Sequence, residues 1–140
     1  MIVVDTNVIS ELARQMPAPE VISWIDSLAT GEVATTAITA AELLYGVARL
    51  PDGRRKTELS AAVNGLLNNE LDGRVLPFDR LAADRYADIV SRRERLGQPI
   101  GIADAQIAAI CSTAGAALAT RNIADFEDTG IELINPWSLA

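Results

Sequence analysis

Short apolar runs alternate along the chain with longer stretches in which apolar residues recur every three or four positions. The short runs are rich in β-branched residues or alanine, which predicts buried strands at residues 2–4, 33–35, 75–78, 117–120 and 131–134. The longer stretches predict helices over residues 6–13, 19–28, 40–48, 55–72, 81–96 and 102–114. This alternation predicts an α/β fold with a parallel sheet covered on both faces.

The composition is that of a globular protein. A chain of 140 residues has a one-domain length, so we expect a single domain over residues 1–140. Its 49% apolar and 22% charged residues exclude intrinsic disorder. No apolar stretch is long enough to span a membrane, and the first residues lack the pattern of a signal peptide. We therefore expect a cytoplasmic protein with no membrane partner, and we expect the one cysteine, Cys111, to lie reduced in a helix core.

Acidic and amide side chains follow several of the predicted strands. Asp5 comes directly after the first strand, Glu42 lies in the helix after the second, and Asn122 and Asp125 follow the fourth. The carboxyl ends of parallel strands meet at one edge of a sheet, so these residues should converge there. Asp104 lies in the first turn of a helix and joins them only if that helix packs against the same edge.

The chemistry of these side chains favours a bound cation. Carboxylates that are close together without a counter-charge raise one another's pKa values. Oxygen ligands without histidine or cysteine suit Mg²⁺, with Mn²⁺ as the alternative ion, and such ions promote phosphodiester hydrolysis. The chain contains no histidine, which excludes histidine-dependent triads, and it contains neither a P-loop nor a G-x-G-x-x-G motif.

Each of these residues also has a purely structural interpretation. Thr39 and Glu42 have the spacing of a capping box, in which Glu42 would bind the start of its own helix. Asp104 would complement a helix dipole, and Asp79 is expected to cap the helix that follows it. Asp5 would serve as a turn or cap residue.

The charge of the chain gives a further constraint on its partners. The net charge of −7 argues against the usual basic nucleic-acid binder. Basic residues nevertheless cluster at residues 49–56 and 92–95. We expect these clusters to be solvated helix faces, with contact to phosphates as the alternative.

Five segments, in this order and at these separations, resemble a PIN domain, and more narrowly a VapC-type toxin of bacterial toxin–antitoxin pairs. The segments are VDTNVISE at residues 4–11, ITAAELLYG at 38–46, LPFD at 76–79, IADAQIAA at 102–109 and ATRN at 119–122, and NPW at 135–137 also matches. The resemblance implies a PIN-like three-layer α/β/α fold with a central, mostly parallel five-stranded sheet. It also implies an endoribonuclease that depends on Mg²⁺ or Mn²⁺.

The resemblance assigns the catalytic positions one by one. The acidic quartet of the family corresponds to Asp5, Glu42, Asp104 and Asn122, with Asp5 and Asp104 as metal ligands. The fourth position is an aspartate in many PIN domains, and here it is a carboxamide. Whether Asn122 or Asp125 fills it stays open at this point.

The same motifs give supporting roles to four residues. Thr6 and Asn7 would orient Asp5 or a water of the site by hydrogen bonds. Thr120 and Arg121 lie at the same edge, and Arg121 would either contact a phosphate or pair with the surrounding acids.

The resemblance also implies partners. These are an RNA substrate, a cognate antitoxin, and a second copy of the chain in a homodimer, or a heteromer with the antitoxin. Leu44, Tyr45, Val47 and Leu50 would line a groove for an amphipathic antitoxin helix, although core positions are the simpler interpretation of Leu44 and Val47.

Two other functions stay open from the sequence. A catalytically silent PIN-like module would bind RNA or antitoxin without cleaving, and Asn122 favours it. An acidic-pocket signalling domain would need a lysine beside the acids, but the only lysine, Lys56, lies in a polar helix start.

Overall fold

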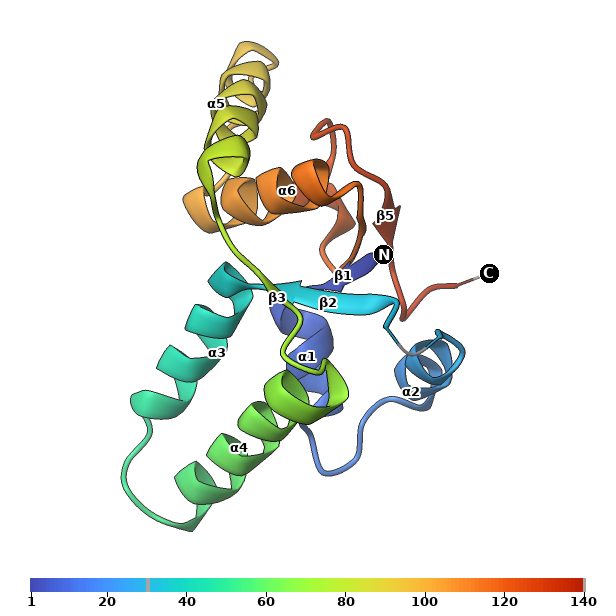
Figure 1. Ribbon diagram of the computed structural model, residues 1–140, viewed down its shortest axis with the longest axis vertical. Helices are drawn as coiled ribbons and strands as arrows, with labels where there is room; N and C mark the ends of the chain where they lie inside the picture. Colours follow the sequence, from blue (N-terminus) through green and yellow to red (C-terminus); the bar gives the residue numbers. More distant parts are fainter. Residues whose placement is uncertain (30, 140) are drawn as a thin grey trace.

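The computed structural model describes residues 1–29 and 31–139 and has a five-stranded sheet at its centre (Figure 1). The strands are β1 (Ile2–Val4), β2 (Val33–Thr36), β3 (Val75–Leu76), β4 (Ala117–Ala119) and β5 (Leu133–Ile134). Their order across the sheet is β3-β2-β1-β4-β5, and every neighbouring pair is parallel. The predicted α/β fold is confirmed, and the sheet is parallel throughout the described residues rather than mostly parallel.

Helices connect these strands and cover both faces of the sheet. They are α1 (Thr6–Leu12), α2 (Pro19–Asp26), α3 (Ala37–Ala48), α4 (Arg54–Gly65), α5 (Arg80–Arg95) and α6 (Ile102–Ala114). A π-helical turn, Leu66–Glu70, extends α4, and a 3₁₀ turn, Ile123–Phe126, follows β4. The predicted helices are confirmed, with differences at their ends.

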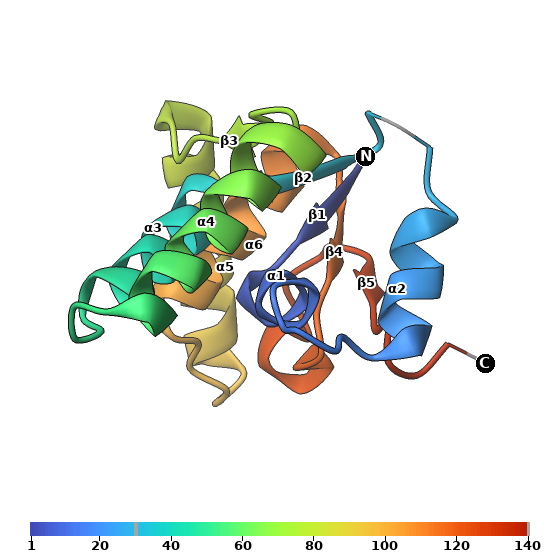
Figure 2. The ribbon, with the colours of Figure 1, turned by 90° about the horizontal axis from the view of Figure 1, so that it is seen from below.

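The pleat of the central strands divides the core in two. Successive side chains of a strand point to opposite faces of the sheet. Val4 and Ala119 pack in one apolar cluster with residues of α1, α2, α3 and α4. Val3 and Leu118 pack in a second cluster with α5 and α6. Figure 2 looks onto α4, α1 and α2, which cover the first face. The three layers that the resemblance implied are therefore present.

The helix caps confirm one structural interpretation and contradict another. Helix α3 begins at Ala37 rather than at residue 40, because the Thr36 hydroxyl accepts a hydrogen bond from the Thr39 N–H at 3.1 Å. The capping-box interpretation of Glu42 is therefore wrong. Helix α1 is capped by Asp5, which agrees with the interpretation of Asp5 as a cap residue.

The region around β3 also differs in detail. The predicted strand included Phe78, but β3 ends at Leu76. Phe78 instead meets the ring of Tyr86 edge-on, with 6.0 Å between ring centroids. The expected cap of α5 is confirmed, since Asp79 accepts a hydrogen bond from the Ala82 N–H at 3.0 Å.

Glycines at a helix end and in a helix interior give opposite predictions for stability. Gly115 ends α6 with φ +63°, a left-handed conformation that costs a residue with a Cβ about 1–2 kcal/mol. Gly46 lies within α3, where no atom lies within 4 Å of an added Cβ, so alanine should stabilise by roughly 0.5–1 kcal/mol. Urea unfolding should therefore show Gly115→Ala less stable and Gly46→Ala more stable than the parent. Equal midpoints for the two variants would contradict this description of the α6 terminus.

No helix in residues 1–29 and 31–139 has both the length and the apolar character needed to cross a membrane.

Candidate functional site

Asp5 lies where the order of the strands reverses. Strands β1 and β4 are neighbours, although β2 and β3 come between them in sequence. The carboxyl ends of such a pair are the usual ligand-binding position of a parallel sheet. The Asp5 N–H donates to the Ala119 carbonyl at 3.1 Å, which fixes Asp5 against β4. Its carboxylate accepts a hydrogen bond from the Val8 N–H at 3.2 Å.

The surroundings of Asp5 make its negative charge costly. The residue is only 5% exposed, and this burial raises the pKa of Asp5 above its ordinary value of 3.8. Hydrogen bonds from the Thr120 hydroxyl and from the backbone N–H groups of Val8 and Asn7 act in the opposite direction. The nearby charge of Asp104 raises the pKa again. A cation at this position would remove the cost.

Asp104 reaches the same edge because α6 packs against α5 and against the face of the sheet to which Val3 and Leu118 point. Its pKa is also raised, first by burial and then by the charges of Asp125 and Glu42, whereas Arg93 lowers it. The structure therefore brings Asp104 near Asp5, Glu42 and Asp125. The sequence could not predict this, because no strand precedes Asp104 directly.

Glu42 is exposed and lies on the first turns of α3. Its Oε1 accepts a hydrogen bond from the Thr6 hydroxyl at 3.0 Å. Thr6 had been expected to orient Asp5 or a water, and in the structure its hydroxyl bonds to Glu42. The backbone N–H of Asn7 bonds to the Asp5 carboxylate, and the supporting role of its side chain stays a prediction.

The loop after β4 is hydrogen-bonded to Thr120, which in turn bonds to Asp5. The buried Thr120 hydroxyl accepts a hydrogen bond from the Asn122 N–H at 3.0 Å and also bonds to Asp5. Asn122 begins the 3₁₀ turn that contains Asp125. This turn packs against α6, and the charge of Asp125 raises the pKa of Asp104.

The donor set fits a hard divalent cation in an open site. Carboxylate and carboxamide oxygens suit Mg²⁺, which takes one or two carboxylates directly and keeps several waters. Within residues 1–29 and 31–139, no three His, Cys, Asp or Glu side chains are close enough together to enclose a metal ion. The carboxylates are thus near enough to repel one another but do not form a closed cage.

The chain matches the PIN domain family over residues 2–132. The chain belongs to the PIN-domain family. It is 44% identical over 140 residues, all of both chains, to VapC ribonuclease Y4jK of Sinorhizobium fredii. It is 40% identical to Toxin FitB of Neisseria gonorrhoeae over 98% of this chain and 99% of that one. A solved structure of FitAB bound to an IR36 DNA fragment superposes with a TM-score of 0.92 at 39% identity, over 100% of this chain and 98% of that one.

Arg121 lies beside the site of this PIN domain but does not enter the acidic group. Its guanidinium lies 5.0 Å from the centroid of the Trp137 ring. Its charge also contributes to the lowered pKa of Glu11, whose main cause is a hydrogen bond from the Ala18 N–H. The acid that it influences is therefore outside the expected quartet.

The structure also shows which of the other singled-out side chains are buried and which are exposed. Val47 is buried, as expected, whereas Leu44 is exposed and Tyr45 is 66% exposed. Cys111 is fully buried, which raises the pKa of its thiol to about 12 and makes it a poor nucleophile.

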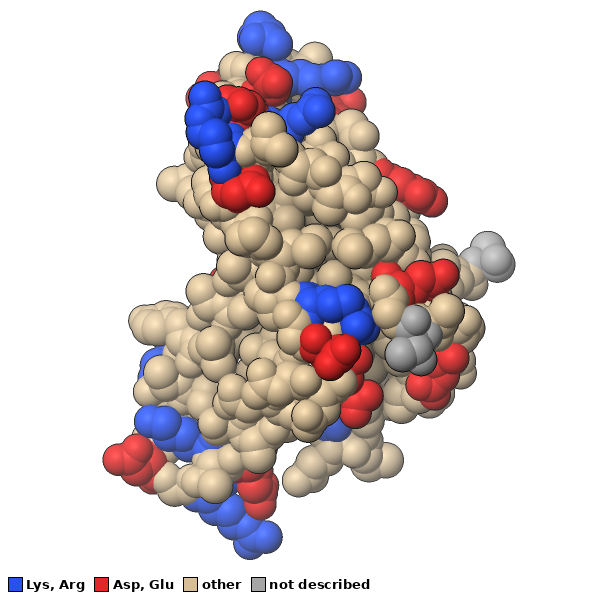
Figure 3. All heavy atoms as spheres, in the orientation of Figure 1, with Lys and Arg blue, Asp and Glu red and all other residues tan. Residues whose placement is uncertain are grey.

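In Figure 3 the Lys and Arg side chains gather over α5 at the top and near α4 at the bottom.

Sequence reasoning missed one residue near the site, Arg93. It was grouped with the solvated basic cluster of residues 92–95, yet it is buried. The sequence could have shown that Arg93 is buried, because it lies at helical spacing from the apolar residues of the buried face of α5. These residues are Ala82, Tyr86 and Ile89.

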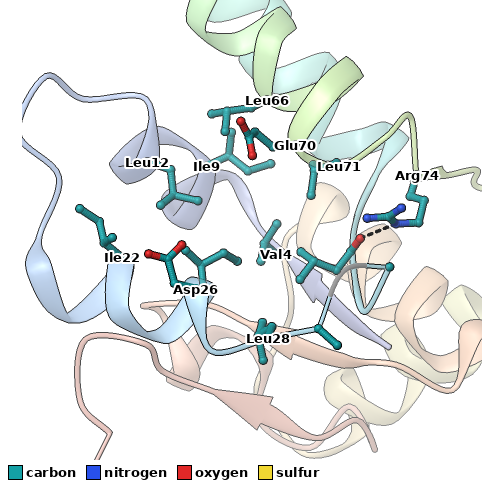
Figure 4. A pocket seen from close by; sticks show the side chains of 14 residues that line it. Val4, Ile9, Leu12, Ile22, Asp26, Leu28, Leu66, Glu70, Leu71 and Arg74 are labelled. Carbon is teal, nitrogen blue, oxygen red and sulfur yellow. Dashed lines mark hydrogen bonds between the residues drawn. The ribbon is translucent and has the colours of Figure 1, made fainter.

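A separate cavity of about 450 Å³ lies between α1, α2 and the π-helical turn, on the face of the sheet that these helices cover (Figure 4). Its lining is mostly apolar, with Asp26, Glu70 and Arg74 as its charged residues. The Arg74 Nε donates to the Val33 carbonyl at 2.8 Å. None of the quartet residues lines this cavity, so it is distinct from the acidic site.

Proposed function

We propose that this PIN domain is the toxin of a toxin–antitoxin pair and an endoribonuclease that depends on Mg²⁺, with Mn²⁺ as a substitute. The main support is the group of Asp5, Glu42, Asp104 and Asp125 at the switch point of the sheet, where Asp5 and Asp104 have raised pKa values. Buried carboxylates that repel one another favour a bound cation. The names of the relatives, a VapC ribonuclease and a toxin, support RNA as the substrate.

Each residue has a distinct task in this proposal. Asp5 and Asp104 would bind the cation directly, since they are the acids whose charge most needs compensation. A bound divalent cation would lower the pKa of a water molecule and offset charge on the phosphodiester. Glu42, held by Thr6, and Asp125 would complete the oxygen donors around it. Asn122 would contribute through its backbone bond to Thr120, which braces Asp5.

The expected partner is a cognate antitoxin, as the similarity to FitAB supports. A chain of net charge −7 would attract a partner with basic side chains. Leu44 and Tyr45 are exposed on α3, where an apolar segment of the partner or a second copy of the chain could pack. The homodimer stays a prediction.

The proposal is tested by cleavage of total bacterial RNA with the purified, antitoxin-free protein. We expect discrete fragments with Mg²⁺ or Mn²⁺, and none with EDTA or in the Asp5→Asn variant. Asparagine is also a good N-cap, so Asp5→Asn should keep the start of α1 intact. RNA binding that is independent of metal, without cleavage by the folded parent, would instead support the catalytically silent module.

The bond between Thr6 and Glu42 leads to a further prediction. Thr6→Val keeps the shape of the side chain but removes the hydroxyl that holds Glu42. We expect cleavage to fall by about 10-fold, the usual lower limit for losing such an orienting contact. Ser10→Ala, on an exposed position of the same helix, is the control. Equal initial rates for the two variants would show that Glu42 does not need Thr6.

A further inference from the structure

Arg93 differs from the other arginines at the end of α5. Arg92 and Arg95 are exposed, whereas Arg93 is only 6% exposed. A buried guanidinium is unfavourable unless its N–H groups are satisfied. Arg93 must therefore have partners that compensate for its burial.

These partners are backbone carbonyls from two separate segments. The Arg93 Nε donates to Gln98 O at 2.6 Å, in the turn after α5. The Nη1 donates to Asp125 O at 3.1 Å and to Glu127 O at 2.8 Å, in and after the 3₁₀ turn. In residues 1–29 and 31–139, no carboxylate makes an ion pair with Arg93. The side chain thus joins the end of α5 to the loop that contains Asp125.

The same loop has a second anchor on the other side of Asp125. Phe126 is buried in the apolar cluster beneath α5 and α6, and its carbonyl accepts a hydrogen bond from the Thr129 hydroxyl at 2.6 Å. The Asp125 side chain itself is exposed. Its position relative to Asp104 therefore depends on how the backbone is held, and Arg93 holds that backbone at Asp125 itself.

Packing gives a second reason to connect these residues. The 3₁₀ turn that contains Asp125 packs against α6, the helix whose first turn contains Asp104. By holding the backbone of this turn, Arg93 acts on a segment that lies against the helix of Asp104.

We propose that Arg93 is a positioning residue that holds the backbone of Asp125 so that its carboxylate faces Asp104, and thereby sets the affinity of the site for a divalent cation. This inference rests on the proposed function, because it assumes that Asp104 and Asp125 serve one cation. Arg93 itself contacts neither the cation nor RNA in this role.

The test is a Mn²⁺ titration of the metal-free protein, followed by electron paramagnetic resonance of the free ion. We expect Arg93→Met to weaken Mn²⁺ binding by about 10-fold or more, in the range seen when outer contacts of a metal site are lost. Arg92→Met, one position along on the exposed face, should bind as the parent does. Arg93→Lys should be intermediate, because an ammonium cannot span the same carbonyls as a guanidinium.

A double-mutant comparison separates positioning from general loosening of the fold. If Arg93 acts through Asp125, then Asp125→Asn and Arg93→Met together should bind Mn²⁺ no more weakly than the weaker single variant. Losses that multiply in the double variant, or equal affinity of Arg93→Met and Arg92→Met, would overturn the inference. If Arg93→Met does not fold, the same comparison is made with Arg93→Lys.

The outcome also separates this inference from the proposed function. Mn²⁺ binding that is lost in Asp104→Asn but unchanged in the folded Arg93 variants would overturn the role of Arg93 alone. A parent protein that binds no Mn²⁺ would overturn both.

Discussion

Asp104→Asn should abolish RNA cleavage while the protein becomes more stable in the absence of metal. The substitution removes a charge that would hold the cation, and we expect a loss of cleavage on the order of 10³-fold. The fold should survive, because asparagine has nearly the same shape and α6 begins at Ile102 without needing a side-chain cap from this residue. Initial rates on a defined RNA substrate with Mg²⁺ would measure the loss.

The gain in stability follows from the direction of the pKa shift. The pKa of Asp104 is raised above 3.8 in the folded protein, so the folded state binds the proton more tightly than the unfolded state. Stability contributed by this group therefore falls as pH rises above about 3.8 and through the raised pKa. In EDTA at pH 7, Asp104→Asn should unfold at a higher temperature than the parent, and the difference should shrink towards pH 4. Full activity, or a lower unfolding temperature at pH 7, would contradict the description of the site.

Asp125→Asn should reduce cleavage far more than Asn122→Ala. Asp125 acts on Asp104 through its charge, whereas Asn122 reaches the network through its backbone N–H, which alanine retains. We expect a loss of about 10- to 100-fold for Asp125→Asn and a much smaller one for Asn122→Ala. Rates for both variants over a series of Mg²⁺ concentrations would show whether the loss is one of cation affinity.

Asp128→Asn is a matched control for this pair, since Asp128 is an exposed acid just after the same turn. Its rate should equal that of the parent. The reverse ranking, with Asn122→Ala inactive and Asp125→Asn active, would place the fourth oxygen donor at Asn122.

The sequence predicted the architecture well because its pattern is local. The buried runs at β1, β2 and β4 and the periodic stretches of α5 and α6 each specify their own element. Helix starts were less accurate, since a threonine or aspartate near a helix start has several N–H groups that it can cap. Thr36 caps α3, where the sequence interpretation had used Thr39, whereas Asp5 caps α1 as its structural interpretation expected.

The site could be predicted only as far as strand ends determine it. Asp5 and the loop after β4 follow directly from the parallel sheet. The place of Asp104 depends on how α6 packs, and the backbone of Asp125 is bonded to Arg93, a residue 32 positions earlier in the chain. Hydrogen bonds such as the one between Thr6 and Glu42 join residues distant in sequence, so spacing alone could not reveal them.

The most direct test of the central claim is the origin of the oxygen in the cleaved phosphate. We propose that water attacks the phosphodiester, so cleavage of a defined RNA in H₂¹⁸O with Mg²⁺ should place one ¹⁸O atom in the new terminal phosphate. Mass spectrometry of the earliest fragments would detect it, with the EDTA sample and Asp5→Asn as blanks. Fragments that end in an unlabelled cyclic phosphate would mean attack by the ribose hydroxyl, and the absence of fragments from folded, metal-loaded protein would contradict the enzyme itself.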